Sequence, residues 1–294
     1  MRKYLFVVLI LASAVFNSVA AYAADRIMIG IIPEVNLAKQ MERFTPLCMY
    51  IGRHLGMEVG VKPLANYGLI YEEMRDGKID AGFFGSFVYG LTHARIGIEP
   101  IARPVRSDGV STYTGYTIVR KDSGIKSAQD MKGKTIALVD PATTAGYLAQ
   151  RAYLKKGGLD IDRDLKIFWA SSHDAAAMAV FNKRADIAGA KDSPIKKLMK
   201  ENSVFKDAVT VLDETPNPPV PDNTFAVIKG MKPELKEKIR KALLSMDKDP
   251  EGKQVLEKFG AAGFVETHDK DYKSLYDLVK YLGIDMKTYS YKKQ

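Results

Sequence analysis

Residues 134–150, KTIALVDPATTAGYLAQ, combine a strand, a sharp turn and the start of a helix. The apolar run is typical of a buried strand, and an Asp-Pro pair ends it. Thr143 or Thr144 is suited to cap the helix that follows, and Gly146 allows close approach of the backbone. Helix capping alone would explain one threonine. Unpaired amides, the positive end of the helix dipole and two hydroxyls together predict a seat for an oxyanion.

The same alternation of strand and helix recurs along the chain. Strands are predicted from RIMIGIIP, MEVGVKPLA, DAGFFG, YTGYTIVRKD, DLKIFWAS, ADIAGA and TFAVIKG, and helices from LAKQMERFTPLCMYIGRHLG, NYGLIYEEMRDGKI, HDAAAMAVFNKR, SPIKKLMKEN, KPELKEKIRKALLSM and PEGKQVLEKFG. This order predicts an α/β protein with mixed, mostly parallel sheets covered by helices.

The 294 residues are enough for two packed α/β units. The middle portion has its own core, and the tail supplies a strand and helices that return to the first unit. We therefore expect a discontinuous lobe 1, residues 24–117 plus 224–294, and a lobe 2, residues 118–223. Two crossings between the lobes make a hinge.

The N-terminus reads as a signal peptide, residues 1–23. Arg2 and Lys3 precede an apolar run and an A-x-A pair at Ala21 and Ala23. The run, at about twelve residues, is short for a membrane span. We therefore expect an exported, periplasmic protein. The single cysteine, Cys48, cannot form an internal disulfide and is interpreted as a small buried apolar residue.

The charge is positive but dispersed. The chain carries 44 basic and 35 acidic side chains, a formal net charge of +9. Its lysines are scattered and do not form a stripe with interleaved aromatic residues, so a nucleic-acid partner is not expected. A mildly basic surface favours the approach of small anions.

Other turns point to the same edge of each sheet. Polar helix starts follow strands at His173 and Asp174, at Ser86, and at Tyr67. In open parallel sheets, ligands bind outside the carboxyl ends of strands. His173 has three interpretations: a structural cap, an anion ligand or a catalytic base. No histidine spacing suggests a metal, and the nucleophile elbow of hydrolases is missing. We therefore expect no metal and no enzyme; an exported hydrolase using His173 with Asp174 or a threonine is a weaker alternative.

Four segments together resemble the phosphonate/phosphite/phosphate substrate-binding proteins of ABC transporters. They are IGIIPE, LANYGLIYEEMRDGKIDAGFFG, TYTGYTIVRKDSGIKSAQDMKGKTIALVDPATTAGY and SSHDAAAMAVFNKRADIAG. The resemblance covers nearly all of the mature chain. It implies a type II periplasmic binding protein whose two lobes close on a ligand, with no cofactor, and a permease as partner. A monomer is expected.

The resemblance also implies site residues. The expected ligand-binding set, completed by Ser86 from the turns above, is Tyr67, Ser86, Tyr116, Thr143, Thr144, the amide of Ala145, His173, Ser193 and Asn223. Relatives that take aminoalkyl phosphonates carry acids at the last two places. Here the acids, Asp192 and Asp222, stand one residue earlier, so a small oxyanion such as phosphite, phosphate or methylphosphonate is expected.

A second hypothesis keeps the same fold but gives the protein a role in sensing and not in transport. The loaded protein would dock on a membrane histidine kinase and report an oxyanion, for example one that contains arsenic. Cys48 would then matter as a soft ligand.

Overall fold

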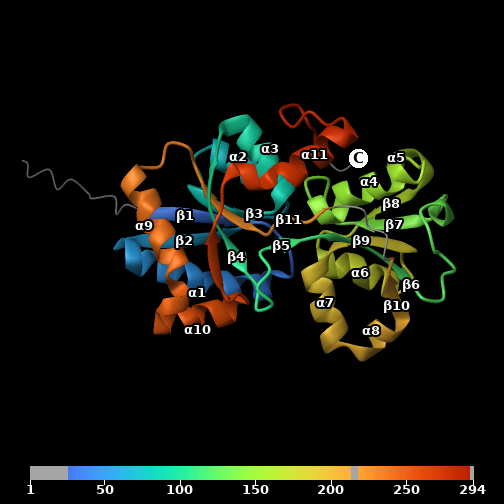
Figure 1. Cartoon of the computed structure of the whole chain (residues 1–294), viewed down its shortest axis with the longest axis horizontal. Helices are drawn as coiled ribbons and strands as arrows, with labels where there is room; N and C mark the ends of the chain where they lie inside the picture. Colours follow the sequence, from blue (N-terminus) through green and yellow to red (C-terminus); the bar gives the residue numbers. More distant parts are fainter. Residues whose placement is uncertain (1–25, 213–217, 292–294) are drawn as a thin grey trace, which may run out of the picture.

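The computed structural model describes residues 26–212 and 218–291. The signal peptide predicted for residues 1–23 lies outside these ranges. The described chain forms two α/β lobes side by side, each built around its own sheet (Figure 1). None of the described helices has the length and apolar character that crossing a membrane requires.

Lobe 1 contains a six-stranded sheet in the order β13-β4-β12-β3-β1-β2. Its strands are β1 (Arg26–Ile31), β2 (Glu58–Pro63), β3 (Ala81–Phe84), β4 (Glu99–Val105), β12 (Thr224–Val227) and β13 (Gly263–Glu266). Its helices are α1 (Leu37–Leu55), α2 (Leu69–Arg75), α3 (Ser86–Ile96), α9 (Pro233–Leu244), α10 (Pro250–Phe259) and α11 (Lys273–Leu282), with short 3₁₀ turns at Met246–Lys248 and Asp269–Tyr272. Helix α1 packs on α9 and α10, whereas α3 packs on α2 and α11 above the opposite face (Figure 1).

Lobe 2 contains a five-stranded sheet in the order β10-β6-β9-β7-β8. Its strands are β6 (Gly115–Arg120), β7 (Thr135–Leu138), β8 (Lys166–Trp169), β9 (Ile187–Lys191) and β10 (Val209–Val211). Its helices are α4 (Ala149–Lys156), α5 (Ile161–Asp164), α6 (His173–Phe181), α7 (Asp192–Glu201) and α8 (Ser203–Ala208), with a 3₁₀ turn at Gln129–Met131.

Both sheets are mixed, as predicted, but parallel pairings do not predominate as the sequence had suggested. Parallel pairing joins β1 to β2 and β3 in lobe 1, and β7 to β8 and β9 in lobe 2. The strands next to the crossings, β12 and β6, run antiparallel to their neighbours. Parallel strands are therefore confined to the part of each sheet where helices connect consecutive strands.

The two crossings between the lobes lie against each other. Strands β5 (Thr112–Tyr113) and β11 (Val220–Pro221) form an antiparallel ribbon in which Val220 pairs with Tyr113. The sequence-based lobe limits, between residues 117 and 118 and between 223 and 224, lie close to this ribbon. Figure 1 shows it midway between the two sheets.

The predicted oxyanion turn begins one continuous helical segment. A π-helical turn, Thr144–Leu148, runs directly into α4. A Cβ atom on Gly146 would lie 2.6 Å from Cγ2 of Val139, so only glycine allows the helix to start this close to the end of β7. The predicted end of α1 at Gly56 is also confirmed, because Gly56 adopts the left-handed conformation with φ of 67°.

The lobes are closed against each other. The Phe87 amide in α3 donates to the Thr144 hydroxyl of lobe 2 over 2.9 Å. A C-terminal strap, residues 284–291, follows α11 across the top of the molecule (Figure 1). In the strap, the Tyr289 hydroxyl donates to the Pro141 carbonyl over 2.9 Å, and its ring meets Phe87 at 5.1 Å.

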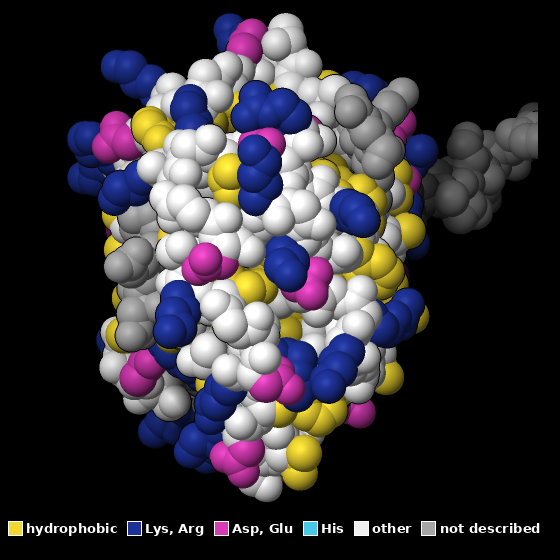
Figure 2. Space-filling view, turned by 90° about the vertical axis from the view of Figure 1, so that its right-hand side faces the viewer, with side chains coloured by type: hydrophobic (Ala, Val, Ile, Leu, Met, Phe, Trp, Pro, Cys, Tyr) yellow, Lys and Arg dark blue, Asp and Glu magenta, His cyan; other side chains and the backbone are white. Residues whose placement is uncertain are grey.

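Charged side chains on lobe 2 are mixed in sign. Figure 2, which faces the lobe 2 end of the molecule, shows lysines and arginines spread among acidic side chains with apolar patches between them. On this face the basic residues do not gather into one continuous stripe.

Candidate ligand-binding site between the lobes

A small cavity lies at the junction of the lobes. Its volume is about 10 Å³, close to the smallest space that holds one water molecule. It is lined by Glu34, Tyr67, Gly85, Tyr113, Ala142, Thr143, Thr144, Ala145, His173, Lys191 and Asn223. Most of these residues follow the carboxyl ends of parallel strands, β1 to β3 in lobe 1 and β7 to β9 in lobe 2, where open α/β sheets bind ligands.

The two threonine hydroxyls of the turn have different roles: that of Thr143 holds the turn itself, and that of Thr144 lies at the interface of the lobes. Thr143 donates its hydroxyl to the Asp140 carbonyl over 2.7 Å, and the Ala142 amide donates to the Asp140 carboxylate over 2.9 Å. Asp140 thus holds the turn in shape. The amides of Thr144 and Ala145 lie in the first helical turn, where a helix provides no acceptor of its own. These amides can therefore bind an anion in the cavity.

Tyr67 has a buried hydroxyl that finds no hydrogen-bond partner among the described residues. Burial raises the pKa of this phenol well above its usual value, so the group is a neutral donor. An unpaired buried hydroxyl costs free energy unless something else satisfies it. Because Tyr67 lines the cavity, a ligand in the cavity can satisfy it.

His173 is neutral, and the ring nitrogen that carries its proton follows from its hydrogen bond. Its Nδ1 atom accepts the Lys191 amide over 3.1 Å, so the neutral ring carries its proton on Nε2. Burial lowers the pKa of His173 to about 4, and the charge of Lys191 acts in the same direction against the opposing effect of Glu34. At neutral pH the residue offers the cavity an uncharged N–H donor.

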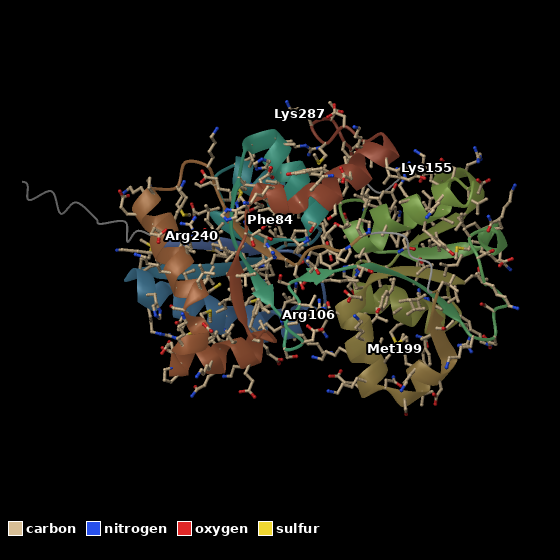
Figure 3. All side chains as sticks on the ribbon, in the orientation of Figure 1. Phe84, Arg106, Lys155, Met199, Arg240 and Lys287 are labelled. Carbon is tan, nitrogen blue, oxygen red and sulfur yellow. The ribbon has the colours of Figure 1, made fainter. Side chains whose placement is uncertain are left out.

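A buried ammonium links the two lobes. Lys191 Nζ lies 2.6 Å from Asp222 Oδ1, 3.2 Å from Glu34 Oε1 and 3.3 Å from Asn223 Oδ1. Its side chain is 7% exposed, and Nζ lies 4.6 Å from the centre of the Tyr113 ring. Asp222 has a second cation, Arg106, 3.7 Å from its other carboxylate oxygen. Figure 3 labels Arg106 between the two lobes.

The ion cluster keeps its charges in spite of burial. Burial alone would raise the pKa of Glu34, but Lys191, His173 and Arg43 together lower it below its usual value. Burial alone would lower the pKa of Lys191, but Asp222 and Glu34 raise it above its usual value. Both groups are therefore ionised at neutral pH. Lys191 is the main group that keeps Glu34 charged, and Asp222 and then Glu34 are the main groups that keep Lys191 charged.

The structure brings six of the nine expected site residues to the cavity. They are Tyr67, Thr143, Thr144, Ala145, His173 and Asn223. The other three are not among the residues that line this cavity, and their role as ligand contacts stays a prediction. Ser86 donates its hydroxyl to the Pro221 carbonyl, Tyr116 packs against Lys196, and Ser193 lies in the first turn of α7.

The neighbouring acids, Asp192 and Asp222, are also not among the residues that line the cavity. Asp192 accepts the Thr114 amide and pairs with Lys196, while Asp222 lies behind Lys191. The sequence interpretation missed Glu34, Tyr113 and Lys191. Glu34 and Lys191 could have been found, because Lys191 ends a buried apolar strand and Glu34 comes three residues after the end of another.

Cys48 does not line the cavity. Cys48 is buried in α1 within the cluster of lobe 1 that surrounds Phe44 and Phe83, not among the cavity residues, and burial raises the pKa of its thiol to about 12. Such a thiol is a poor metal or metalloid ligand. Among the described residues, no group of histidine, cysteine and acidic side chains could hold a metal ion.

Two lobes, a double-stranded connection and a closed cavity lined by hydrogen-bond donors and by the Lys191–Glu34 ion pair define a two-lobed ligand-binding protein. The chain belongs to the family described as "ABC transporter, phosphonate, periplasmic substrate-binding protein", whose pattern matches residues 29–272.

Named relatives agree with this assignment. The chain is 27% identical over 194 residues to the phosphate-import protein PhnD of Mycolicibacterium smegmatis, an alignment that covers 62% of this chain and 60% of that protein. It is 25% identical over 296 residues to the probable ABC transporter phosphite binding protein PhnD1 of Prochlorococcus marinus, covering 94% and 96%. The solved structure of Prochlorococcus marinus PhnD1 with methylphosphonate superposes with a TM-score of 0.78 at 19% identity, over 88% of this chain and 98% of that one.

Proposed function

We propose that this protein captures a small phosphorus oxyanion, namely phosphite, phosphate or methylphosphonate, between its lobes in the periplasm and delivers it to an ABC importer. The observation that carries the proposal is the unpaired Tyr67 hydroxyl at a cavity that also receives His173 Nε2–H and the amides of Thr144 and Ala145. These donors come from both lobes. A tetrahedral anion with several oxygens can accept from all of them at once.

The ligand classes are supported by the relatives. Their names concern phosphate, phosphite and methylphosphonate, which share a tetrahedral phosphorus with at least two charged or hydrogen-bonding oxygens. Ligands of this kind bind by closure, which removes the anion from water and surrounds it with fixed dipoles.

We also propose that the protein performs no chemistry. His173 Nδ1 is used by the Lys191 amide, and the Asp174 carboxylate accepts from the Ser172 hydroxyl and the Ala175 amide. Asp174 therefore caps its own helix and does not orient the histidine as a catalytic acid would. Assays with chromogenic carboxylic and phosphate esters should show no turnover.

Ligand binding is tested by calorimetry and thermal shift on the purified protein with phosphate, phosphite, methylphosphonate and sulfate. A true ligand raises the free energy of unfolding by about 2.7 kcal/mol at a hundredfold excess over its dissociation constant. At least one phosphorus oxyanion should do so, and sulfate should do so less. Failure of all three phosphorus compounds to bind would overturn the proposal.

The receiving partner is tested in cells that carry or lack the gene. If a permease receives the loaded protein, loss of the gene abolishes uptake of the labelled oxyanion. If a membrane sensor kinase receives it, uptake is unchanged and the transcriptional response to the oxyanion is lost. A Cys48→Ala variant should bind every oxyanion like the wild type, because the thiol is buried away from the cavity.

A further inference from the structure

The cavity contains a cation of its own. Lys191 Nζ is within hydrogen-bonding distance of three oxygen acceptors, on Asp222, Glu34 and Asn223. An ammonium has three N–H donors, so these acceptors use its full capacity. The Tyr113 ring covers a further side of the ammonium. The side chain is thus held in one place and is a built part of the cavity wall.

The carboxylates near the cavity have cations already. Glu34 pairs with Lys191 and also receives a hydrogen bond from the Asn223 side chain. Asp222 pairs with Lys191 on one oxygen and Arg106 on the other. A positively charged group on a ligand would find no unpaired acid among these residues, and it would meet the like charge of Lys191 in a site that excludes water. Like charges at such sites are strongly unfavourable.

From this geometry we infer that Lys191 is a specificity-determining residue: its ammonium occupies the position that a cationic substituent of the ligand would need. The inference rests on the proposed function and deepens it. The site accepts oxyanions with small uncharged substituents and rejects those with an ammonium group. Lys191 also adds a positive charge beside the anion, which the neutral donors of lobe 2 do not provide.

The removal of Lys191 should reverse this preference. In Lys191→Met, Glu34 and Asp222 lose their shared cation and space is freed beside them. An ammonium carried by the ligand can then replace the missing one. Methylphosphonate, in contrast, loses an attractive charge and meets two carboxylates with less compensation.

The test uses calorimetry with methylphosphonate, ethylphosphonate and 2-aminoethylphosphonate. Ethylphosphonate separates the effect of size from that of charge. Wild-type protein should bind methylphosphonate most tightly and ethylphosphonate more tightly than 2-aminoethylphosphonate. In Lys191→Met, affinity for 2-aminoethylphosphonate should rise about tenfold relative to ethylphosphonate, since one desolvated charge pair is worth at least that factor.

Lys196→Met is the matched control. Lys196 pairs with Asp192 four residues earlier, and its side chain is 54% exposed and outside the cavity lining. It should leave all three affinities unchanged. Removing one partner of a buried ion cluster can prevent folding, so circular dichroism and melting of Lys191→Met are recorded first. If that variant does not fold, the order of affinities in the wild type decides the inference.

The possible failures are distinguishable. Wild-type protein that binds neither phosphate nor phosphite nor any of the three phosphonates overturns the proposed function and this inference with it. Wild-type protein that binds phosphate or phosphite but none of the three phosphonates overturns the inference alone, because such a site accepts no substituent. Wild-type protein that binds 2-aminoethylphosphonate as tightly as ethylphosphonate overturns the inference alone. A folded Lys191→Met variant with unchanged relative affinities also overturns it alone.

Discussion

The hydroxyl of Tyr67 is a single group whose removal separates binding from stability. Because it has no partner in the described protein, Tyr67→Phe should leave the melting temperature of the ligand-free protein unchanged or raise it. The same change removes one donor to the ligand. Affinity for methylphosphonate, measured by calorimetry, should fall by about tenfold.

Tyr113→Phe is the comparison for this change. The Tyr113 hydroxyl lines the same cavity but accepts the Ser86 amide over 3.3 Å. Its loss leaves a buried N–H without an acceptor and should lower the free energy of unfolding by about 1 kcal/mol or more. The role of Tyr67 would be refuted if Tyr67→Phe were destabilised as much as Tyr113→Phe and kept full affinity.

His173 makes stability depend on pH. Its pKa is 6.5 in a free chain and about 4 in the folded protein, so the unfolded state binds more protons between these values. The free energy of unfolding should therefore decrease as pH falls from 6.5 towards 4, by on the order of 3 kcal/mol at about 1.4 kcal/mol per pKa unit. Denaturant titrations of the ligand-free protein across this range measure the slope.

His173→Asn should reduce this slope, because asparagine does not titrate and can still offer an oxygen to the Lys191 amide. The pKa of Glu34 is lowered from its usual value of 4.5, so protonation of this group reduces the free energy of unfolding mainly as the pH falls below that value. The raised pKa of Lys191 gives stability that is complete throughout this range. An identical slope in wild type and variant would show that His173 is not the titrating group.

At the level of single residues, the sequence predicted the neutral donors better than the charges. Thr144 and His173 follow strands in recognisable turns, and both line the cavity. Lys191 stands at the end of a buried strand, which marks it as a candidate, but its ion pairs with distant segments leave no local pattern in the sequence. Its contact with Glu34 of lobe 1, 157 residues earlier in the chain, forms only because the two lobes close together.

At the scale of elements, the junction of β7 with its helix requires glycine. In Gly146→Ala the new methyl group would lie 2.6 Å from Val139 Cγ2 and 2.8 Å from the Thr143 hydroxyl oxygen. The helix start must move, which should cost about 1–3 kcal/mol of stability and weaken oxyanion binding. Chemical denaturation and calorimetry measure the two effects.

Gly230→Ala provides the matched control. A Cβ atom there meets no atom within 4 Å, and the residue is not in the left-handed region. Its stability should stay within about 0.5 kcal/mol of wild type, as expected for surface changes. Equal effects of the two alanine substitutions would contradict the proposed close packing of the helix start.

Many of the elements were predicted from the sequence, but the missed ones include regular elements as well as short ones. Helix α1 was predicted to its last turn, whereas β4, β13 and α11 were not identified. Strand β4 contains Pro100 and Pro104, which normally argue against a strand between two neighbours. Its pairing with β12 shifts register next to Pro100, between Phe225 and Ala226, and sequence alone does not reveal this irregularity. Pro104 lies opposite Phe264 of β13.

For the whole molecule, the C-terminal strap should help to hold the lobes together. Tyr289→Phe removes the hydrogen bond to the Pro141 carbonyl of lobe 2 but keeps the ring on Phe87. A lost interlobe hydrogen bond of about 1 kcal/mol favours the open form and should weaken ligand binding by roughly fivefold. Small-angle scattering should show a larger radius of gyration at subsaturating ligand.

Tyr281→Phe is a suitable control for the strap. Lys155 of lobe 2, labelled in Figure 3, donates to the Tyr281 carbonyl over 2.8 Å and lies over its ring, and neither contact needs the hydroxyl. This variant should bind and scatter like the wild type. If both phenylalanine variants behaved alike, the Tyr289 contact would have no part in closure.

The sequence predicted two lobes because its strands and helices form two sets, but it contained no sign of the strap. Residues 284–291 have no regular period, and their role follows from contacts with Arg95 and Pro141, far away in the chain. Closure is a property of these distant contacts. It therefore had to be seen in the folded molecule.

Because strands β5 and β11 pair with each other, the two ends of lobe 2 lie next to each other. Where the chain leaves lobe 1 it is hydrogen-bonded to the place where it comes back, as Tyr113 pairs with Val220. Lobe 2, the segment between β5 and β11, is therefore a continuous stretch of chain whose two ends are adjacent. Such a stretch could be cut out and joined by a short linker, or exchanged for that of a relative, so that one half of the binding surface could be replaced by genetic grafting while the other half stays intact.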